Sequence, residues 1–405
     1  MPGSWLDLPQ HQAWLAREEA RLSAFARAAA DPAGGFGWLD EYGRRDPSQQ
    51  VMTWITGRMT HVFALAHLRG EPGAGPLADH GIAALTGLLR DPEHGGWFPG
   101  AAQGVPVDTA KGAYEHAFVV IGAASATAAG RPGAAELLAE ALDVVEKRFW
   151  DDAAGLSVEG WDRAWQETEA YRGANSNMHM IEAMLVAGDV TGAAIWHRRA
   201  LRIAERLAHG MAAEHGWRLP EHFTPEWEPL PEYNADQKRH QFRPYGTTPG
   251  HALEWARLLV HLEAALGADA PAWLLADAES LFEAAVRLGW RADGSDGFVY
   301  TLDWSDRPVV RERMHWVAAE AVLSAAVLYR RTGDDRYEQW YRTWWDYIAQ
   351  HVIDPVHGSW RHELDAENGP SATVWSGKPD VYHAYQAVLL PVLPLAASPA
   401  GALRS

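Results

Sequence analysis

Long stretches of the chain place apolar residues at helical spacing. The segments GAAELLAEALDVVEKRFW (133–150) and HWVAAEAVLSAAVLYRRTGD (315–334) alternate Ala, Leu and Val with charged residues. Their period is close to 3.6 residues, which is typical of an amphipathic helix. The pattern therefore predicts a chain that is mainly helical.

A short motif recurs six times between these helical stretches: an acidic or polar turn, then glycine, then an aromatic residue. Its glycines are separated by 60, 60, 61, 81 and 61 residues. Such regularity indicates repeat architecture, and about 60 residues hold two helices with their connections. The marker glycines are Gly35, Gly95, Gly155, Gly216, Gly297 and Gly358. The spacing predicts six helical hairpins.

We expect these hairpins to close into an all-α (α/α)6 barrel, a single domain over residues 1–405 with short loops or hairpins on one rim. An open α-solenoid is the alternative, although its usual repeats of about 34 to 47 residues are shorter. The 81-residue interval holds an insertion around residues 220–250, rich in proline and polar residues. Long ordered loops are commonly functional, so this insertion is a candidate lid.

Composition narrows the classes of partner. The net charge is -18 and no Lys/Arg patch stands out, which argues against nucleic acid and against an anionic membrane surface. The absence of cysteine excludes thiol chemistry and disulfides. The N-terminus lacks the features of a signal peptide and no apolar run is long enough to span a bilayer, so a cytoplasmic location is expected. The 21 Trp suit a helical core or stacking on sugar faces.

In each repeat one helix opens with polar residues among small ones, and each such opening contains a histidine. If these first turns meet at one end of a ring, they converge on one polar pocket. The residues that we select from these openings are Arg58, His116, Asn175, His179, His251, Glu254, Trp316, Glu320, Trp375, Asp380 and His383.

Each histidine also has a structural interpretation, because a helical histidine is more often a structural residue than a catalyst. That interpretation is favoured for His61 and balanced for His116 and His315. By contrast, His179, His251 and His383 follow small or helix-disfavouring residues that leave room for a ligand. A buried Arg58 would need an oxygen-rich partner.

Other common chemistries lack their signals. The chain contains no GxSxG elbow, P-loop or strand-linked GxGxxG, and no HExxH. His and Glu candidates occur one per helix rather than in a cluster, so a dedicated metal site is the minority interpretation. We expect no metal and no cofactor.

The segments SNMHMIEAML, FRPYGTTPGHALEWARLL, ERMHWVAAEAV and KPDVYHAYQAVLLP resemble the N-acylglucosamine 2-epimerase superfamily over nearly the whole chain. Within it, the resemblance is greatest to the metal-independent aldose–ketose isomerases. It implies an (α/α)6 barrel, which the repeat count reaches independently. It also implies a monosaccharide substrate and a monomer or homodimer.

The resemblance assigns roles by motif. It implies that His251 and His383 form the central histidine pair, with His179 as the third pocket histidine. Glu254 and Glu320 fall at positions that orient histidines, and Arg58 and Arg243 at the pocket arginines. Trp316 and Trp375 fall where aromatic residues line the sugar site.

The implied reaction interconverts D-mannose and D-fructose, and also D-lyxose and D-xylulose, through an enediol. One histidine would move the proton between carbons 2 and 1 while the other opens the ring, and Arg58 would stabilise the oxyanion. Glu254, three residues after His251, would fix its tautomer. A sugar 2-epimerase, a sulfoquinovose isomerase and a non-enzymatic sugar-binding scaffold are the alternatives.

Overall fold

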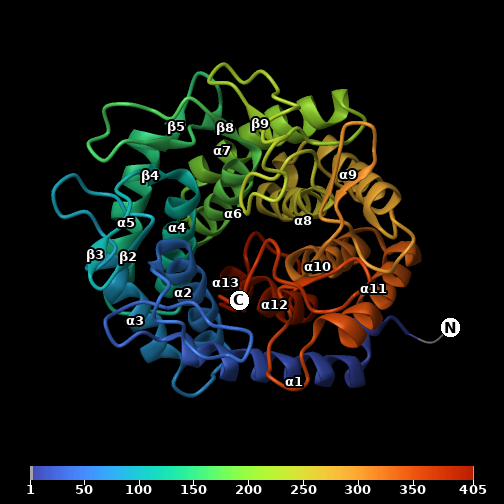
Figure 1. Cartoon of the computed structure of the whole chain (residues 1–405), viewed down its shortest axis with the longest axis horizontal. Helices are drawn as coiled ribbons and strands as arrows, with labels where there is room; N and C mark the ends of the chain where they lie inside the picture. The colour runs from blue at the N-terminus through green and yellow to red at the C-terminus, as the bar shows by residue number, and fades with distance from the viewer. Residues whose placement is uncertain (1–2, 405) are drawn as a thin grey trace. The chain divides into compact units, whose positions relative to one another are not determined.

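The computed structural model describes residues 3–404 as helices joined by short strands and turns (Figure 1). No helix among these residues has both the length and the apolar character that crossing a bilayer requires. The α-helices are α1 (Pro9–Ala26), α2 (Thr53–Leu68), α3 (Ala74–Thr86), α4 (Ala113–Ala128), α5 (Ala134–Val144), α6 (Ala174–Thr191), α7 (Ala194–Ala204), α8 (Pro249–Leu266), α9 (Trp273–Gly289), α10 (His315–Thr332), α11 (Asp335–Tyr347), α12 (Tyr382–Leu389) and α13 (Pro399–Ala402).

Short helical segments of 3₁₀ or π type extend or precede several of these helices. They are η1 (Trp5–Asp7), η2 (Arg27–Ala29), η3 (Val145–Phe149), η4 (Glu205–Ala212), η5 (Gly267–Asp269), η6 (Ile348–Val352) and η7 (Leu390–Val392). The strands have two or three residues each. They are β1 (Val51–Met52), β2 (Gly100–Ala102), β3 (Val105–Pro106), β4 (Lys111–Gly112), β5 (Trp150–Asp151), β6 (Leu156–Ser157), β7 (Gly160–Trp161), β8 (Arg172–Gly173), β9 (His222–Phe223), β10 (Thr301–Leu302), β11 (Pro308–Val310), β12 (Arg313–Met314) and β13 (Glu363–Leu364).

The chain divides into two compact units. Unit 1 contains the residues up to Phe25, Leu207–Lys378 and His383–Leu395. Unit 2 contains Ala26–Arg206, Pro379–Tyr382 and the residues from Ala396 onward. The expectation of a single domain stays a prediction.

Unit 2 holds three helical hairpins. Helices α2, α4 and α6 form a row, and α3, α5 and α7 each pack against the preceding helix of that row (Figure 1). Almost every residue of α2 and α4 is buried, whereas α5 and α7 bury one face only. A helix that is apolar all round belongs in an interior, and an amphipathic helix covers it.

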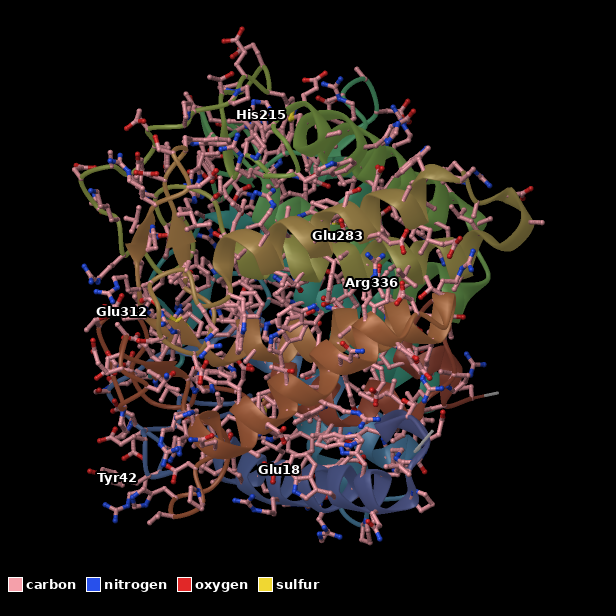
Figure 2. The ribbon with its side chains drawn as sticks, turned by 90° about the vertical axis from the view of Figure 1, so that its right-hand side faces the viewer. Glu18, Tyr42, His215, Glu283, Glu312 and Arg336 are labelled. Atoms are coloured by element: carbon pink, nitrogen blue, oxygen red, sulfur yellow. The ribbon has the colours of Figure 1, made fainter. Side chains whose placement is uncertain are left out.

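Unit 1 repeats this arrangement with α8 and α10 in contact, α9 packed on α8 and α11 packed on α10. Surface ion pairs join the two covering helices; Figure 2 shows Arg336 of α11 beside Glu283 of α9, where their side chains approach to 2.6 Å. The sixth helix pair departs from the prediction of consecutive hairpins. Helix α12 contacts the N-terminal helix α1, and the hydroxyl of Tyr385 donates to Glu19 over 3.1 Å.

The six marker glycines occupy equivalent turns. All six have positive φ, from 65° to 105°, a region that disfavours residues with a Cβ. The acidic residue that opens the turn is used in an equally regular way. Asp91, Asp151 and Asp354 each accept main-chain N–H groups two and three residues onward. The sequence motif that recurs about every 60 residues therefore corresponds to one type of turn, in which an acidic side chain accepts main-chain N–H groups and a glycine has positive φ.

Two of these turns are also tied by a buried lysine. Lys111 reaches Asp91 and the carbonyl of Gly95, both at 2.9 Å. Lys378 makes the same two contacts in unit 1, with the carboxylate of Asp354 and a turn carbonyl, both at 2.7 Å. Burial acts to raise the pKa of Asp354, but the contacts with Lys378 and the turn N–H groups outweigh it and lower that pKa to about 2.

Candidate active site

The helices that carry most predicted site residues begin directly after an extended residue. Helices α2, α4, α6 and α10 follow the short strands β1, β4, β8 and β12, and α8 follows an extended Thr248. This switch from strand to helix places the first-turn side chains beside the incoming strand. Of the polar residues selected from the sequence, three lie in the first turn of these helices and four lie one turn further on: first His116, Asn175 and His251, then Arg58, His179, Glu254 and Glu320.

His251 lies in the first turn of α8 and contacts a carboxylate that sequence reasoning did not select. Its Nδ1 lies 3.0 Å from both carboxylate oxygens of Glu221. His251 and Glu221 are only 7% and 5% exposed, so water does not compete for this contact. In this contact the ring nitrogen donates and the two carboxylate oxygens accept. This bond leaves Nε2 on the opposite edge of the ring for chemistry.

His383 of α12 has the same type of contact. Its Nδ1 lies 3.0 Å from Oε1 of Glu320 on α10, as the resemblance implied for this carboxylate. Glu320 is fully buried and also accepts from Arg257 of α8, whose Nε lies 2.6 Å away. His383 therefore ends a chain of hydrogen bonds that runs from Arg257 through Glu320 to the imidazole ring.

The prediction that Glu254 orients His251 is wrong, because Glu221 occupies that position. Glu254 is buried on α8 and lies 3.5 Å from the guanidinium of Arg257. The helix explains the difference. Positions three apart share a face, but Arg257 is also three residues beyond Glu254 and attracts its carboxylate.

Trp316 lies beside both histidine rings. Its ring centroid is 5.1 Å from that of His251 and 5.9 Å from that of His383. Both interplanar angles are tilted, at 33° and 41°. An aromatic wall of this kind fixes the imidazoles and offers an apolar face.

Trp375 lies on a loop that a single buried carboxylate organises. Glu363 accepts from the main-chain N–H groups of Thr373, Val374 and Trp375 at 2.7 to 2.8 Å. The ring of Trp375 meets Phe242 of the insertion edge-on at 5.3 Å. The long insertion and the tryptophan loop are therefore in direct contact.

Arg243 lies in the same insertion. Its main-chain carbonyl accepts from Asn234 over 2.7 Å, and its N–H donates to the ring of His240. Burial is the larger cause of the lowered pKa of His222, and the guanidinium of Arg243 also contributes to it.

In unit 2 the structure brings together Arg58 and Asp380, both selected from the sequence. They form a buried ion pair at 3.1 Å, and Arg58 also donates to the hydroxyl of Tyr114 over 3.0 Å. Three ring centroids lie 4.4 to 4.9 Å from the guanidinium carbon; the rings are those of Trp54, Phe118 and Tyr382. Burial acts to lower the pKa of Arg58, and the contributions of Tyr114 and Asp380 outweigh it, so the net pKa is raised.

His179 and Asn175 lie on α6 in the same unit. The ring of His179 contacts Tyr114 at 5.2 Å and Phe118 at 4.8 Å, and its Nδ1 lies 3.4 Å from Glu182. Two rings that contact Arg58 therefore also hold His179.

His116 was predicted to bind substrate, and the structure gives it a structural role instead. The ring is fully buried; Nδ1 donates to the carbonyl of Gly112 over 2.6 Å, and Nε2 accepts from the N–H of Trp97 over 3.2 Å. Both nitrogens are occupied by main chain. Burial lowers the pKa of this ring to about 3, so it stays neutral.

Three important carboxylate or arginine side chains were missed: Glu221, Arg257 and Glu363. Arg257 had a signal, since it is a charged residue three positions after Glu254 and so lies on the same face of the helix. Glu221 follows Pro220 at the start of the insertion, 30 residues before its partner. No local pattern links such distant positions.

Among the described residues, Glu254, Glu320 and His383 offer ligand atoms within 4.8 Å of one another, a spacing that a metal ion accepts. The guanidinium of Arg257 already contacts both carboxylates. A buried cation in this position neutralises the charge that would attract a divalent ion. The expectation of no metal stays a prediction.

Comparison with known proteins defines the class. A model of the family described as N-acylglucosamine 2-epimerase (GlcNAc 2-epimerase) matches residues 34–387. A solved structure of a D-mannose isomerase superimposes with a TM-score of 0.88 at 28% identity, covering 95% of this chain and 99% of the other. Cellobiose 2-epimerase from Spirochaeta thermophila has the same fold, with a TM-score of 0.82 at 23% identity, covering 95% and 96% of the two chains. The predicted fold class, an all-α (α/α)6 barrel, is confirmed.

Two curated relatives extend over nearly the full length. The D-mannose isomerase of Thermobifida fusca is 61% identical over 401 residues, covering 98% of each chain. The D-mannose isomerase of Pseudomonas cannabina pv. alisalensis is 53% identical, covering 99% of this chain and 97% of its own. The chain belongs to the N-acylglucosamine 2-epimerase family.

Proposed function

We propose that this protein is an aldose–ketose isomerase that interconverts D-mannose and D-fructose. The observation that carries the proposal is the pair of buried histidines in unit 1, each with Nδ1 held by a carboxylate at 3.0 Å. Relatives that bear this activity in their names and share 61% and 53% of the sequence support the same substrate. D-Lyxose and D-xylulose form a second substrate pair for the same chemistry.

The reaction is a proton transfer with internal redox balance. After ring opening, a base removes the proton from carbon 2 and the electron pair of that bond forms the enediol. Protonation at carbon 1 then gives the ketose, so carbon 2 is oxidised while carbon 1 is reduced. A histidine suits both steps because its ordinary pKa lies near neutral pH, and each positioned acid or base contributes about 10²- to 10⁴-fold.

In this proposal Nε2 is the working nitrogen of both histidines, because Nδ1 is bound to a carboxylate in each. One ring transfers the carbon-bound proton and the other exchanges protons with the sugar oxygens. Trp316, beside both rings, lines the site. The roles predicted for Arg58, His179, Asn175 and Arg243 rest on the sequence motifs.

The test is proton NMR of D-mannose in heavy water with purified, EDTA-treated protein. We expect D-fructose with deuterium at the exchanged carbon, and activity that survives EDTA. Formation of D-glucose alone would instead indicate a 2-epimerase that shares the enediol. No change in mannose, together with turnover of sulfoquinovose, would indicate the sulfonated sugar. Loss of activity with EDTA and its return with a divalent ion would contradict a metal-free mechanism.

The monosaccharide nature of the substrate, the monomeric or dimeric state and the cytoplasmic location stay predictions. Size-exclusion chromatography with light scattering measures the second of these directly.

A further inference from the structure

We propose that Glu221 is a positioning residue for the isomerisation: it holds His251 in the tautomer and orientation in which Nε2 faces the substrate. The inference rests on the proposed function and adds a residue to it. Both oxygens of Glu221 lie 3.0 Å from Nδ1 of His251, a forked contact that restricts rotation of the ring. The carboxylate acts through His251, not on the sugar.

The other faces of His251 are also constrained. The ring lies 5.1 Å from Trp316 at 33°, so its plane is supported on one side. At Gly250, the residue before His251, the main chain packs so closely on α10 that an added Cβ would lie 2.5 Å from Val317 and 2.7 Å from Trp316. Helix α8 therefore begins in close contact with α10, which places the main chain of His251. The rotation of its ring then depends on the contact between Nδ1 and Glu221.

Glu221 is held in place by the foot of the insertion, by which we mean His222 and the residues that it contacts, Tyr233, Leu230 and Pro244. The next residue, His222, uses Nε2 to donate to the carbonyl of Pro244 over 2.8 Å, and its ring lies 4.7 Å from that of Tyr233. Its main-chain carbonyl accepts from Leu230 over 2.8 Å. The two ends of the insertion are thus joined at the residue beside Glu221.

Burial is the main cause that lowers the pKa of His222. A neutral ring donates from one nitrogen only, so the bond to Pro244 selects its tautomer. The insertion was predicted as a lid; its foot also presents a carboxylate to the histidine at the start of α8.

The contact of Glu221 with Nδ1 of His251 is the kind of contact that supports a histidine acting as an acid or a base. A base whose second nitrogen is held by a carboxylate keeps one tautomer and stabilises the imidazolium that forms during proton transfer. Groups that orient metal-bound histidines in this way contribute about 10- to 100-fold, and we expect a contribution of that order for His251. Glu254, the carboxylate that the sequence suggested for this role, faces Arg257 instead.

The experiment compares Glu221→Ala and Glu221→Gln with the wild-type protein. Glu226→Gln is the matched control, because it removes the same charge from an exposed site of the same insertion. We expect kcat for D-mannose to fall about 10- to 100-fold in the alanine variant, with KM changed less than about 3-fold. Formate or acetate added to that variant should restore part of kcat, and neither should affect Glu226→Gln.

A second readout does not depend on activity. In protein labelled with ¹⁵N-histidine, the His251 signals, assigned from their loss in His251→Asn, should report a proton on Nδ1 in the wild type. Glu221→Ala should shift the ring toward a mixture of tautomers. Circular dichroism checks folding, and if the alanine variant does not fold, the isosteric Glu221→Gln carries the test.

Unchanged kcat and an unchanged tautomer in the folded variants would overturn the proposal, as would a loss that appears only in KM and is not rescued by carboxylate. A wild-type protein that does not isomerise mannose would defeat the proposed function alone. The tautomer measurement still decides the role of Glu221 in that case.

Discussion

The His251–Glu221 and His383–Glu320 pairs share one ring contact, a 3.0 Å bond from Nδ1 to a buried carboxylate. They differ behind the carboxylate. Glu320 lies on α10 and is bound by Arg257 of the neighbouring helix α8. Glu221 lies in a loop, and its support comes from the hydrogen bonds of the foot of the insertion.

The difference separates two ways of placing a carboxylate that orients a histidine. Glu320 is part of the helical core, so its position is coupled to the stability of the fold. Glu221 is placed by a loop that closes on itself, so its position is coupled to the order of that loop. The same chemistry at the ring therefore predicts different responses to mutation.

The largest effect is expected where the pairs are alike. His251→Asn and His383→Asn should each reduce isomerisation by about 10²- to 10⁴-fold and remove exchange of the carbon 2 proton with deuterium. Asparagine retains a polar group but cannot act as the base. Deuterium incorporation by NMR measures both losses, and full exchange in either variant would remove that histidine from the mechanism.

Glu320→Gln should separate the pairs by stability. Because it removes the 2.6 Å ion pair of the buried Arg257 and leaves only the 3.5 Å contact with Glu254, we expect a loss of about 3 to 5 kcal/mol in the free energy of unfolding. Urea denaturation monitored by tryptophan fluorescence measures it.

The double variant Glu320→Gln/Arg257→Met is the control for that prediction. Removing the charges of Glu320 and Arg257 together should recover part of the lost stability, as replacing a buried ion pair often does, but not all of it, because Glu254 then loses its contact with Arg257. The double variant should not recover activity. Equal stability of Glu320→Gln and the wild type would show that the helical pair is no more coupled to the core than the loop pair.

Phe242→Ala should affect only the loop side of the comparison. It removes the edge-on contact with Trp375 at 5.3 Å, and such a contact contributes about 0.5 to 1.5 kcal/mol. We expect faster proteolysis within the insertion and little change in global unfolding. Phe242→Leu, which keeps apolar bulk, is the control; identical cleavage rates in all three proteins would contradict this anchoring of the insertion.

The smallest effect concerns pH. Burial depresses the pKa of His222 below its usual 6.5 in the folded state, so an opened loop binds the proton more readily than the closed one. The contribution of His222 is complete above pH 6.5 and is lost progressively as the pH falls below it. Hydrogen exchange of the insertion should accelerate as the pH falls from about 7 to about 5, after correction for intrinsic rates, and His222→Gln should reduce this dependence.

Several features could be predicted because their causes are local. The marker turns follow from an acidic residue and a glycine at fixed offsets, as the positive φ of Gly95 and Gly358 illustrates. The alternation of buried and covering helices follows from periodicity. The segment ERMHWVAAEAV also marked Glu320 as a residue that orients a histidine, and its carboxylate contacts Nδ1 of His383 in the structure.

Other features could not be predicted because they join distant segments. The contact between α1 and α12 links Glu19 with Tyr385, and no helical period reports it. The structural role of His116 depends on Trp97, which approaches from a turn 19 residues earlier. A histidine in a helix opening looks the same in the sequence whether its nitrogens face a ligand or a main chain.

The sequence by itself determined the helical repeat, the turns between its units and the histidines that begin α8 and α12, since spacing and backbone preference act over a few residues. The tertiary structure decided which carboxylate each histidine contacts. Glu254 was close in sequence to His251, and Glu221 was 30 residues away. In the fold Glu254 contacts Arg257, and Glu221 contacts the ring of His251. Hydrogen bonds form between groups that are close in space, and closeness in sequence does not determine which groups those are.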